Sequence, residues 1–180
     1  MKNRMIKRKI WSVSWRVLAV FIIPILIAVG LIRQDQVPRP VQVGQRAPIF
    51  RLPTTDGTTY ALPNHPKKVI IINFFTTWCP PCQEEAPDFS RFINQFHDQV
   101  QLVMIDRAEG KGIVSSFIRQ YHLQRAVVVL DAADSMAAPY GVTGQPETFG
   151  LDRQGIVKFH LIGPLNYENL VHDLNYLKRT

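Results

Sequence analysis

The residues best suited to chemistry are two cysteines in the segment Trp78-Cys79-Pro80-Pro81-Cys82, and the chain has no others. A disulfide between them would close so short a loop that it would add little chain-entropy stabilisation. A structural crosslink therefore explains the pair poorly, whereas thiol–disulfide exchange explains it well. The pair could also be half of a zinc site, but a second pair of ligands is missing and the five histidines are scattered singly. We therefore expect no metal.

The elements around the pair indicate how the thiols are used. Residues 69–75 (VIIINFF) form a continuous apolar run, which predicts a strand buried on both faces, and a helix is expected over residues 80–96. A helix N-terminus stabilises a thiolate, and Pro80 loses no hydrogen bond in the first helical turn. We predict that Cys79 is the exposed nucleophile and that Cys82, one turn further in, is the resolving thiol. Trp78 is expected to pack beside the sulfurs and shield them.

Glu85 is predicted to be a third participant. On a helical wheel it falls inside the apolar sector of the helix, one turn after Cys82. Desolvation there should raise the pKa of the carboxyl, so that it could accept and return the proton of the buried thiol. The alternative is an acid at the edge of the helix that points into solvent. The sector is formed by Ala86, Phe89, Ile93 and Phe96.

The rest of the chain predicts an α/β fold. The order of elements is β-α-β-α-β-β-α, which indicates a central mixed β-sheet flanked by helices. An N-terminal β-hairpin is expected in residues 44–63, around the turn dipeptide Asp56-Gly57. Further strands are expected at 102–105, 127–130, 149–151 and 156–161, and further helices at 113–121 and 167–177. Residues 144–149 (GQPETF) alone predict only a turn before a strand.

The N-terminus carries the basic excess of the chain. The net charge is +7, but residues 1–16 hold six of the 21 Lys and Arg and no acid. The rest of the chain contains fifteen basic residues and all fourteen acidic residues, so its charges nearly balance. No basic patch is left for a phosphate backbone, and nucleic-acid binding is excluded.

Residues 17–32 are uncharged and predict a transmembrane signal-anchor in the lipid bilayer. The basic flank places residues 1–16 in the cytoplasm. Residues 33–43 contain two prolines and predict an extended tether, and residues 44–180 predict one extracytoplasmic domain. The alternative is a cleaved signal peptide with a small-residue site at residues 28–30. Both interpretations place residues 44–180 outside the cytoplasm.

Four segments together carry a family resemblance. They resemble the thioredoxin superfamily and, within it, the membrane-anchored CcmG/DsbE, ResA and TlpA-type thiol–disulfide oxidoreductases. The GQPETF segment and the Gly-Pro-Leu that follows later are most similar to CcmG/DsbE, the periplasmic reductant of cytochrome c maturation. The segments are residues 44–52 (GQRAPIFRL), 72–87 (INFFTTWCPPCQEEAP), 141–149 (GVTGQPETF) and 152–165 (DRQGIVKFHLIGPL).

The resemblance implies roles for individual residues in a thioredoxin-like fold. Cys79 and Cys82 match the redox pair, and their redox-active disulfide would be the only redox group, with no further cofactor. Pro146 matches a cis-proline facing the pair, and Glu85 matches an acid that tunes the thiols. Glu147 matches a second acid near the site. Substrate contacts are expected from Trp78, Pro80, Pro81, Gln145, Pro146 and Glu147.

Two residues depart from the family pattern. Gln145 replaces the small or branched residue that usually precedes the cis-proline and touches substrate. Gly150 replaces a bulky aliphatic residue.

The resemblance implies a protein-disulfide reductase on the periplasmic side of the inner membrane. The favoured substrate is the Cys-x-x-Cys of apocytochrome c, and a membrane thiol protein would supply the electrons. One alternative is a general envelope thiol reductase. A thiol peroxidase shares the start of the domain but normally lacks an adjacent Cys-x-x-Cys partner, and a copper chaperone for oxidase assembly usually has wider cysteine spacing and a committed histidine.

Overall fold

The computed structural model describes Val20, residues 22–26 and residues 39–180. Val20 and residues 22–26 are helical, and Arg39–Thr180 form a separate compact unit. Most of the predicted anchor, residues 17–32, lies outside the described residues, as do residues 1–16 and most of the predicted tether. Among the described residues, no helix has the length and apolar character needed to cross a bilayer.

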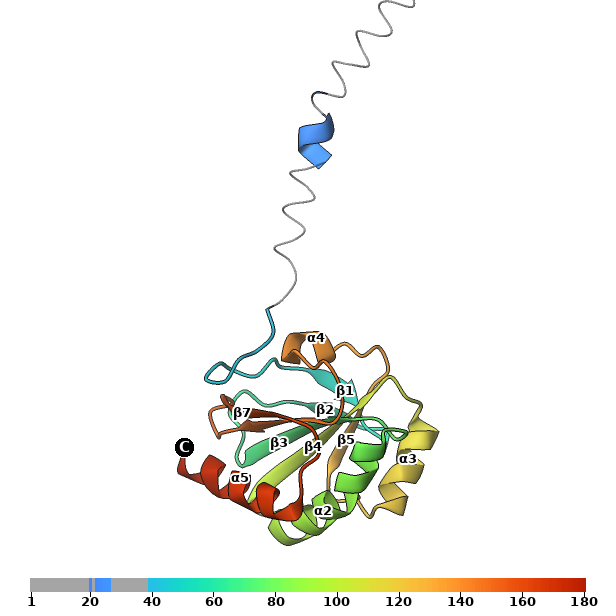
Figure 1. Ribbon diagram of the computed structural model, residues 1–180, viewed down its shortest axis with the longest axis vertical. Coiled ribbons are helices and arrows are strands. Elements are labelled where there is room, and N and C mark those ends of the chain that lie inside the picture. Colours follow the sequence, from blue (N-terminus) through green and yellow to red (C-terminus); the bar gives the residue numbers. More distant parts are fainter. Residues whose placement is uncertain (1–19, 21, 27–38) are drawn as a thin grey trace, which may run out of the picture. The chain divides into compact units, whose positions relative to one another are not determined.

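A five-stranded mixed sheet organises residues 39–180, in the strand order β5-β4-β3-β6-β7 (Figure 1). The central strand β3 runs parallel to β4 and antiparallel to β6, and β4 runs parallel to β5. All seven residues of β3 are buried, as its uninterrupted apolar sequence predicts. The strands are β3 (Val69–Phe75), β4 (Val100–Arg107), β5 (Val127–Asp131), β6 (Glu147–Leu151) and β7 (Val157–Ile162).

Each face of the sheet has its own hydrophobic core. One core joins the sheet to α2 (Pro80–Phe96), α3 (Lys111–Gln120) and α5 (Tyr167–Arg179), and contains both cysteines. The other core joins the opposite face to α4 (Ala137–Tyr140) and to the segment around a short hairpin. That hairpin pairs β1 (Arg51–Pro53) with β2 (Thr59–Ala61). The predicted mixed sheet flanked by helices is therefore confirmed.

The thiol pair lies at the start of helix α2, which follows the central strand β3. Cys79 is its N-cap residue with extended backbone, and two prolines occupy its first turn. The buried side chains recur every three or four residues, which places them on one face against β3 and β4. This is the face that the helical wheel predicts, and its members are Cys82, Glu85, Ala86, Phe89, Ser90, Phe92 and Ile93.

Gly150 on β6 lies opposite Phe159 on β7, and the aromatic ring occupies the space of a side chain. A Cβ atom at Gly150 would overlap Cε1 and Cζ of the ring and lie 2.7 Å from Cδ1. The departure of Gly150 from the family pattern thus follows from the size of Phe159.

Replacing Gly150 with valine is expected to lower the free energy of unfolding by roughly 1–3 kcal/mol, because the Phe159 ring must be displaced. Urea denaturation measures the change. Gly112→Ala is the matched control, since nothing lies within 4 Å of a Cβ atom there. Adding Phe159→Ala to Gly150→Val should recover part of the loss, and a double variant showing the sum of the two losses would contradict this explanation.

Candidate active site

The two cysteines are free thiols at the start of α2. Only 4% of Cys79 and 2% of Cys82 are exposed, which corrects the expectation that Cys79 is an exposed residue. Surface exposure therefore does not distinguish the two thiols. Their surroundings do, because Sγ of Cys79 lies 3.5 Å from the carbonyl oxygen of Gln145, in the loop that faces the helix start.

Cys82 is held in its protonated form. Burial is the main cause that raises its pKa, and a hydrogen bond with the Cys79 thiol and the nearby charge of Glu85 act in the same direction. A backbone hydrogen bond at Thr76 opposes them only in part. Cys82 is therefore a poor first nucleophile and needs a proton acceptor before it can attack.

The residues next to the cysteines form the accessible surface of the site. Trp78 is 64% exposed, so most of its surface faces solvent rather than the sulfurs beside which it is predicted to pack. Pro80 is exposed and Pro81 is half-buried. These residues present apolar surface directly beside a nearly covered thiol, where an approaching polypeptide would meet them.

Glu85 lies in the core, with 2% of its surface exposed. Asn73 Nδ2 donates a hydrogen bond to Oε1 at 2.9 Å, and the backbone N–H of Leu165 donates to Oε2 at 3.0 Å. Burial raises the pKa of Glu85 to about 8 although both hydrogen bonds favour the carboxylate. The burial and the raised pKa predicted from the helical wheel are confirmed. A carboxyl with this pKa can bind and release a proton near neutral pH.

Asn73 is a site residue that the sequence analysis does not single out. It lies fully buried in the middle of β3, where it also donates to Oγ1 of Thr148 at 3.2 Å. Its Oδ1 atom is buried without a hydrogen-bond partner. The available signal was one amide in an otherwise apolar strand, since a buried polar side chain needs a partner such as Glu85.

The cis-proline loop completes the site. The Gln145–Pro146 peptide bond is cis, as the resemblance implies for Pro146. Pro146 is buried, and its carbonyl oxygen accepts from the N–H of Gly163 at 2.9 Å. Gln145 is half-buried and its carbonyl oxygen faces Cys79, so the structure brings this loop to the thiol pair.

Glu147 has a different position from the one expected. Its side chain is fully buried, so a substrate cannot reach it, which corrects the expectation of a substrate contact. One carboxylate oxygen accepts from the N–H groups of Thr143 and Gly144 at 2.8 and 2.9 Å, and the other lies 2.6 Å from His160 Nε2. Burial alone would raise the pKa of Glu147, but the hydrogen bonds outweigh it and the pKa is lowered. Through these hydrogen bonds, the buried carboxylate of Glu147 holds the cis-proline loop in place.

A half-buried acid, Glu109, supports the segment before the cysteines. Glu109 accepts from both the N–H and the hydroxyl of Thr77 at 2.6 Å, and its own N–H donates to Asp106 at 3.1 Å. Burial, with a hydrogen bond from the Glu109 side chain, raises the pKa of Asp106 to about 7. No pattern in the sequence indicates this pair. Across the residues placed by the structure, no three His, Cys, Asp or Glu are grouped to hold a metal ion.

This fold and site define a class of protein. A mixed sheet with a Cys-x-x-Cys pair at a helix start, facing a cis-proline, is the arrangement of a thioredoxin-like thiol–disulfide oxidoreductase. Residues 43–160 match the AhpC/TSA family, and the chain belongs to this family.

Relatives and solved structures agree with this class. The chain is 31% identical to the thiol-disulfide oxidoreductase ResA of Geobacillus thermodenitrificans over 139 residues, which cover 77% of this chain and 79% of the relative. It is 29% identical to sporulation thiol-disulfide oxidoreductase A of Bacillus subtilis over 141 residues, covering 74% and 84%.

Among solved structures, StoA of Bacillus subtilis matches with a TM-score of 0.61 at 29% identity, over 70% of this chain and 96% of that one. A Chlorobium tepidum protein assigned as thiol:disulfide interchange protein DsbE gives a TM-score of 0.69 at 25% identity, over 76% and 98%. The protein is a thiol–disulfide oxidoreductase of the ResA, StoA and DsbE type.

Proposed function

We propose that this protein donates electrons to disulfides of extracytoplasmic proteins, and that its principal substrate is the Cys-x-x-Cys of apocytochrome c. The observation that carries the reductive direction is the environment of Cys82. Burial raises the pKa of this thiol, and the neighbouring Cys79 thiol and Glu85 carboxyl act in the same direction. A site that held its thiols as thiolates would stabilise the reduced form and act as an oxidant; burial keeps Cys82 protonated, so Cys82 adds no such stabilisation to the reduced form.

The exchange would run in two steps. The thiolate of Cys79 attacks one sulfur of the substrate disulfide, which forms a mixed disulfide and releases the other substrate sulfur as a thiolate. Cys82 then loses its proton to Glu85 and attacks Sγ of Cys79. This closes the Cys79–Cys82 disulfide and releases the second substrate sulfur, so that two electrons have passed to the substrate.

The predicted signal-anchor would place this exchange at the outer surface of the inner membrane. With the Cys79–Cys82 disulfide as its only redox group, the oxidised protein would need a membrane thiol protein to reduce it again. The choice of apocytochrome c follows from the likeness of the GQPETF segment to CcmG/DsbE and from the fold shared with a protein assigned as DsbE. Free sulfurs on the substrate Cys-x-x-Cys are what haem attachment requires.

Cells that carry Cys79→Ser are expected to lack covalent c-type cytochromes, because the substrate cysteines would stay oxidised. Haem staining of membrane proteins after denaturing electrophoresis measures the loss. Dithiothreitol in the medium should restore the signal, since the reagent supplies the missing electrons. The control is the same strain complemented with the unaltered chain.

Normal cytochrome c in the Cys79→Ser strain without added thiol, in a background lacking other thiol reductases, would contradict the maturation role. A broad defect in envelope proteins that form and break disulfides, with normal cytochrome c, would favour the general thiol reductase.

A further inference from the structure

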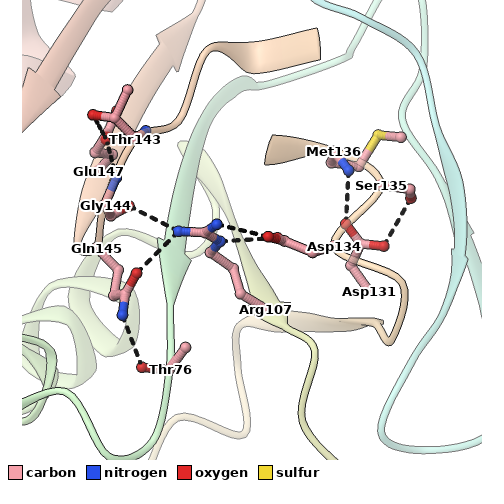
Figure 2. A network of polar contacts seen from close by, with 10 residues as sticks. All are labelled: Thr76, Arg107, Asp131, Asp134, Ser135, Met136, Thr143, Gly144, Gln145 and Glu147. Carbon is pink, nitrogen blue, oxygen red and sulfur yellow. Dashed lines mark hydrogen bonds and ion pairs between the residues drawn. The ribbon is translucent and has the colours of Figure 1, made fainter. Parts of the chain in front are cut away.

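Arg107, the last residue of β4, links two loops through one guanidinium group (Figure 2). Its Nε and Nη2 atoms donate to the two carboxylate oxygens of Asp134 at 2.9 and 2.7 Å. Its Nη1 atom donates to the carbonyl oxygen of Gly144 at 3.2 Å and to Oε1 of Gln145 at 2.9 Å. Two parallel bonds to a carboxylate fix the plane of a guanidinium, so the remaining nitrogen has a set direction.

The Asp134 side of this contact is itself held in place. Asp131 accepts from the hydroxyl of Ser135 at 2.7 Å and from the N–H of Met136 at 2.8 Å, which ties down the turn that carries Asp134 (Figure 2). The side chain of Arg107 is only 17% exposed. A partly desolvated, bidentate ion pair is stronger than an exposed one, so Arg107 is a firm support for the cis-proline loop.

Gln145 is the residue that Arg107 supports, and it contacts the nucleophile directly. Its carbonyl oxygen lies 3.5 Å from Sγ of Cys79, while Arg107 occupies its side-chain oxygen. Its amide nitrogen Nε2 points toward Oγ1 of Thr76 at 3.5 Å (Figure 2). That contact is long for a hydrogen bond, so Nε2 remains able to donate to an approaching group.

We propose that Arg107 is a positioning residue for polypeptide substrates. It fixes the side chain of Gln145 so that Nε2 donates to a backbone carbonyl of the chain whose disulfide Cys79 attacks. The acceptor belongs to an extended polypeptide beside its cysteine; DTNB has carboxylate and nitro oxygens on its rings but no backbone carbonyl next to its sulfur. The inference rests on the proposed action on protein disulfides but not on which protein is the substrate.

The test compares a peptide containing an oxidised Cys-x-x-Cys with the small aromatic disulfide DTNB. Arg107→Ala and Gln145→Ala are each expected to raise KM for the peptide about tenfold, while kcat changes less than about twofold. The kcat/KM value for DTNB should fall much less than the kcat/KM value for the peptide. The double variant should be no worse than either single variant, because both changes remove the same donor geometry.

Two further variants keep the test falsifiable. Arg107→Lys keeps the charge but cannot bind Asp134 and Gln145 in the same fork, so an intermediate KM is expected. Arg119→Ala removes an exposed arginine on α3 and is the matched control, with no expected change. Urea denaturation of each variant shows whether it is folded, and Arg107→Lys carries the test of Arg107 if Arg107→Ala fails to fold.

Equal losses on the peptide and on DTNB would overturn the proposal, since they would mean that Arg107 only maintains the thiol site. Additive losses in the double variant, or an unchanged KM for the peptide, would also overturn it. The assay is run in both directions, because reduction of the peptide disulfide and oxidation of the peptide dithiol pass through the same mixed disulfide. If the protein oxidises the peptide dithiol but does not reduce the peptide disulfide, the proposed reductive function is contradicted. The effect of Arg107 on KM for the peptide can still be measured in the oxidising direction.

Discussion

Replacing Cys79 with serine is expected to lower the rate of protein-disulfide reduction by roughly 10³-fold or more. A serine hydroxyl neither ionises near neutral pH nor forms a disulfide. Cys82 cannot take over the attack, because burial raises its pKa and keeps it protonated. Stopped-flow mixing with DTNB measures the loss directly, since the first equivalent of aromatic thiol is released by the attacking cysteine.

The Cys82→Ser variant is expected to behave differently from Cys79→Ser. It keeps the first attack but cannot resolve the mixed disulfide, so substrate remains bound to Cys79 and can be identified after acid quenching. In the unaltered reduced protein, iodoacetamide should modify Cys79 first, as mass spectrometry of the digested protein would reveal. The variant lacking both cysteines provides the baseline. Faster alkylation of Cys82, or substrate trapped on Cys82 in Cys79→Ser, would reverse the two assignments.

The sequence predicts best those elements whose pattern is local. The run of residues 69–75 predicts β3 with its observed bounds, and the prolines after Cys79 predict the start of α2 correctly. The burial of Glu85 also follows from local periodicity, because one helical face fixes which side chains turn inward. The short helix α4 is not predicted, since four residues are too few to show a period.

The parts of the site that sequence reasoning misses are contacts between distant segments. Arg107, Asp134 and Gln145 lie on three separate elements, and only the folded sheet brings them together. The expectations for Trp78 and Glu147 fail for a similar reason. That for Trp78 comes from its position beside Cys79 and that for Glu147 from the family resemblance, but the direction of a side chain at a loop or strand start depends on what packs against it. Glu147 turns inward because two loop N–H groups and His160 bind its carboxylate.

In Glu85→Gln, the free energy of unfolding is expected to lose the pH dependence that titration of the Glu85 carboxyl produces up to about pH 8. Burial raises the pKa of Glu85 from 4.5 to about 8, so the folded state binds this proton more tightly than the unfolded chain does. The resulting stability is fully present below about pH 4.5, is lost as the pH rises toward 8, and is absent above it. As the pH rises from 5 to 9, the free energy of unfolding of Glu85→Gln, measured by urea denaturation, should increase by roughly 2–4 kcal/mol relative to that of the unaltered protein.

The same substitution is expected to slow the resolving step by roughly 10²-fold at pH 8–9, the usual range for loss of a general base. The second release of aromatic thiol from DTNB reports the attack of Cys82 on Cys79. In the unaltered protein its rate should rise with pH through an inflection near 8, as Glu85 becomes a carboxylate able to accept the Cys82 proton. In Glu85→Gln this inflection should vanish, while the first release stays within about twofold.

Glu84→Gln is the matched control, because Glu84 is the preceding residue of α2 and is exposed. Asp106→Asn distinguishes an inflection caused by Glu85 from one caused by Asp106, because burial raises the pKa of Asp106 to about 7. An inflection near pH 8 that persists in Glu85→Gln would show that another group accepts the proton of Cys82. Glu85 would then be a buried acid that only raises the pKa of the resolving thiol, and the reductive character of the site would rest on burial of Cys82 alone.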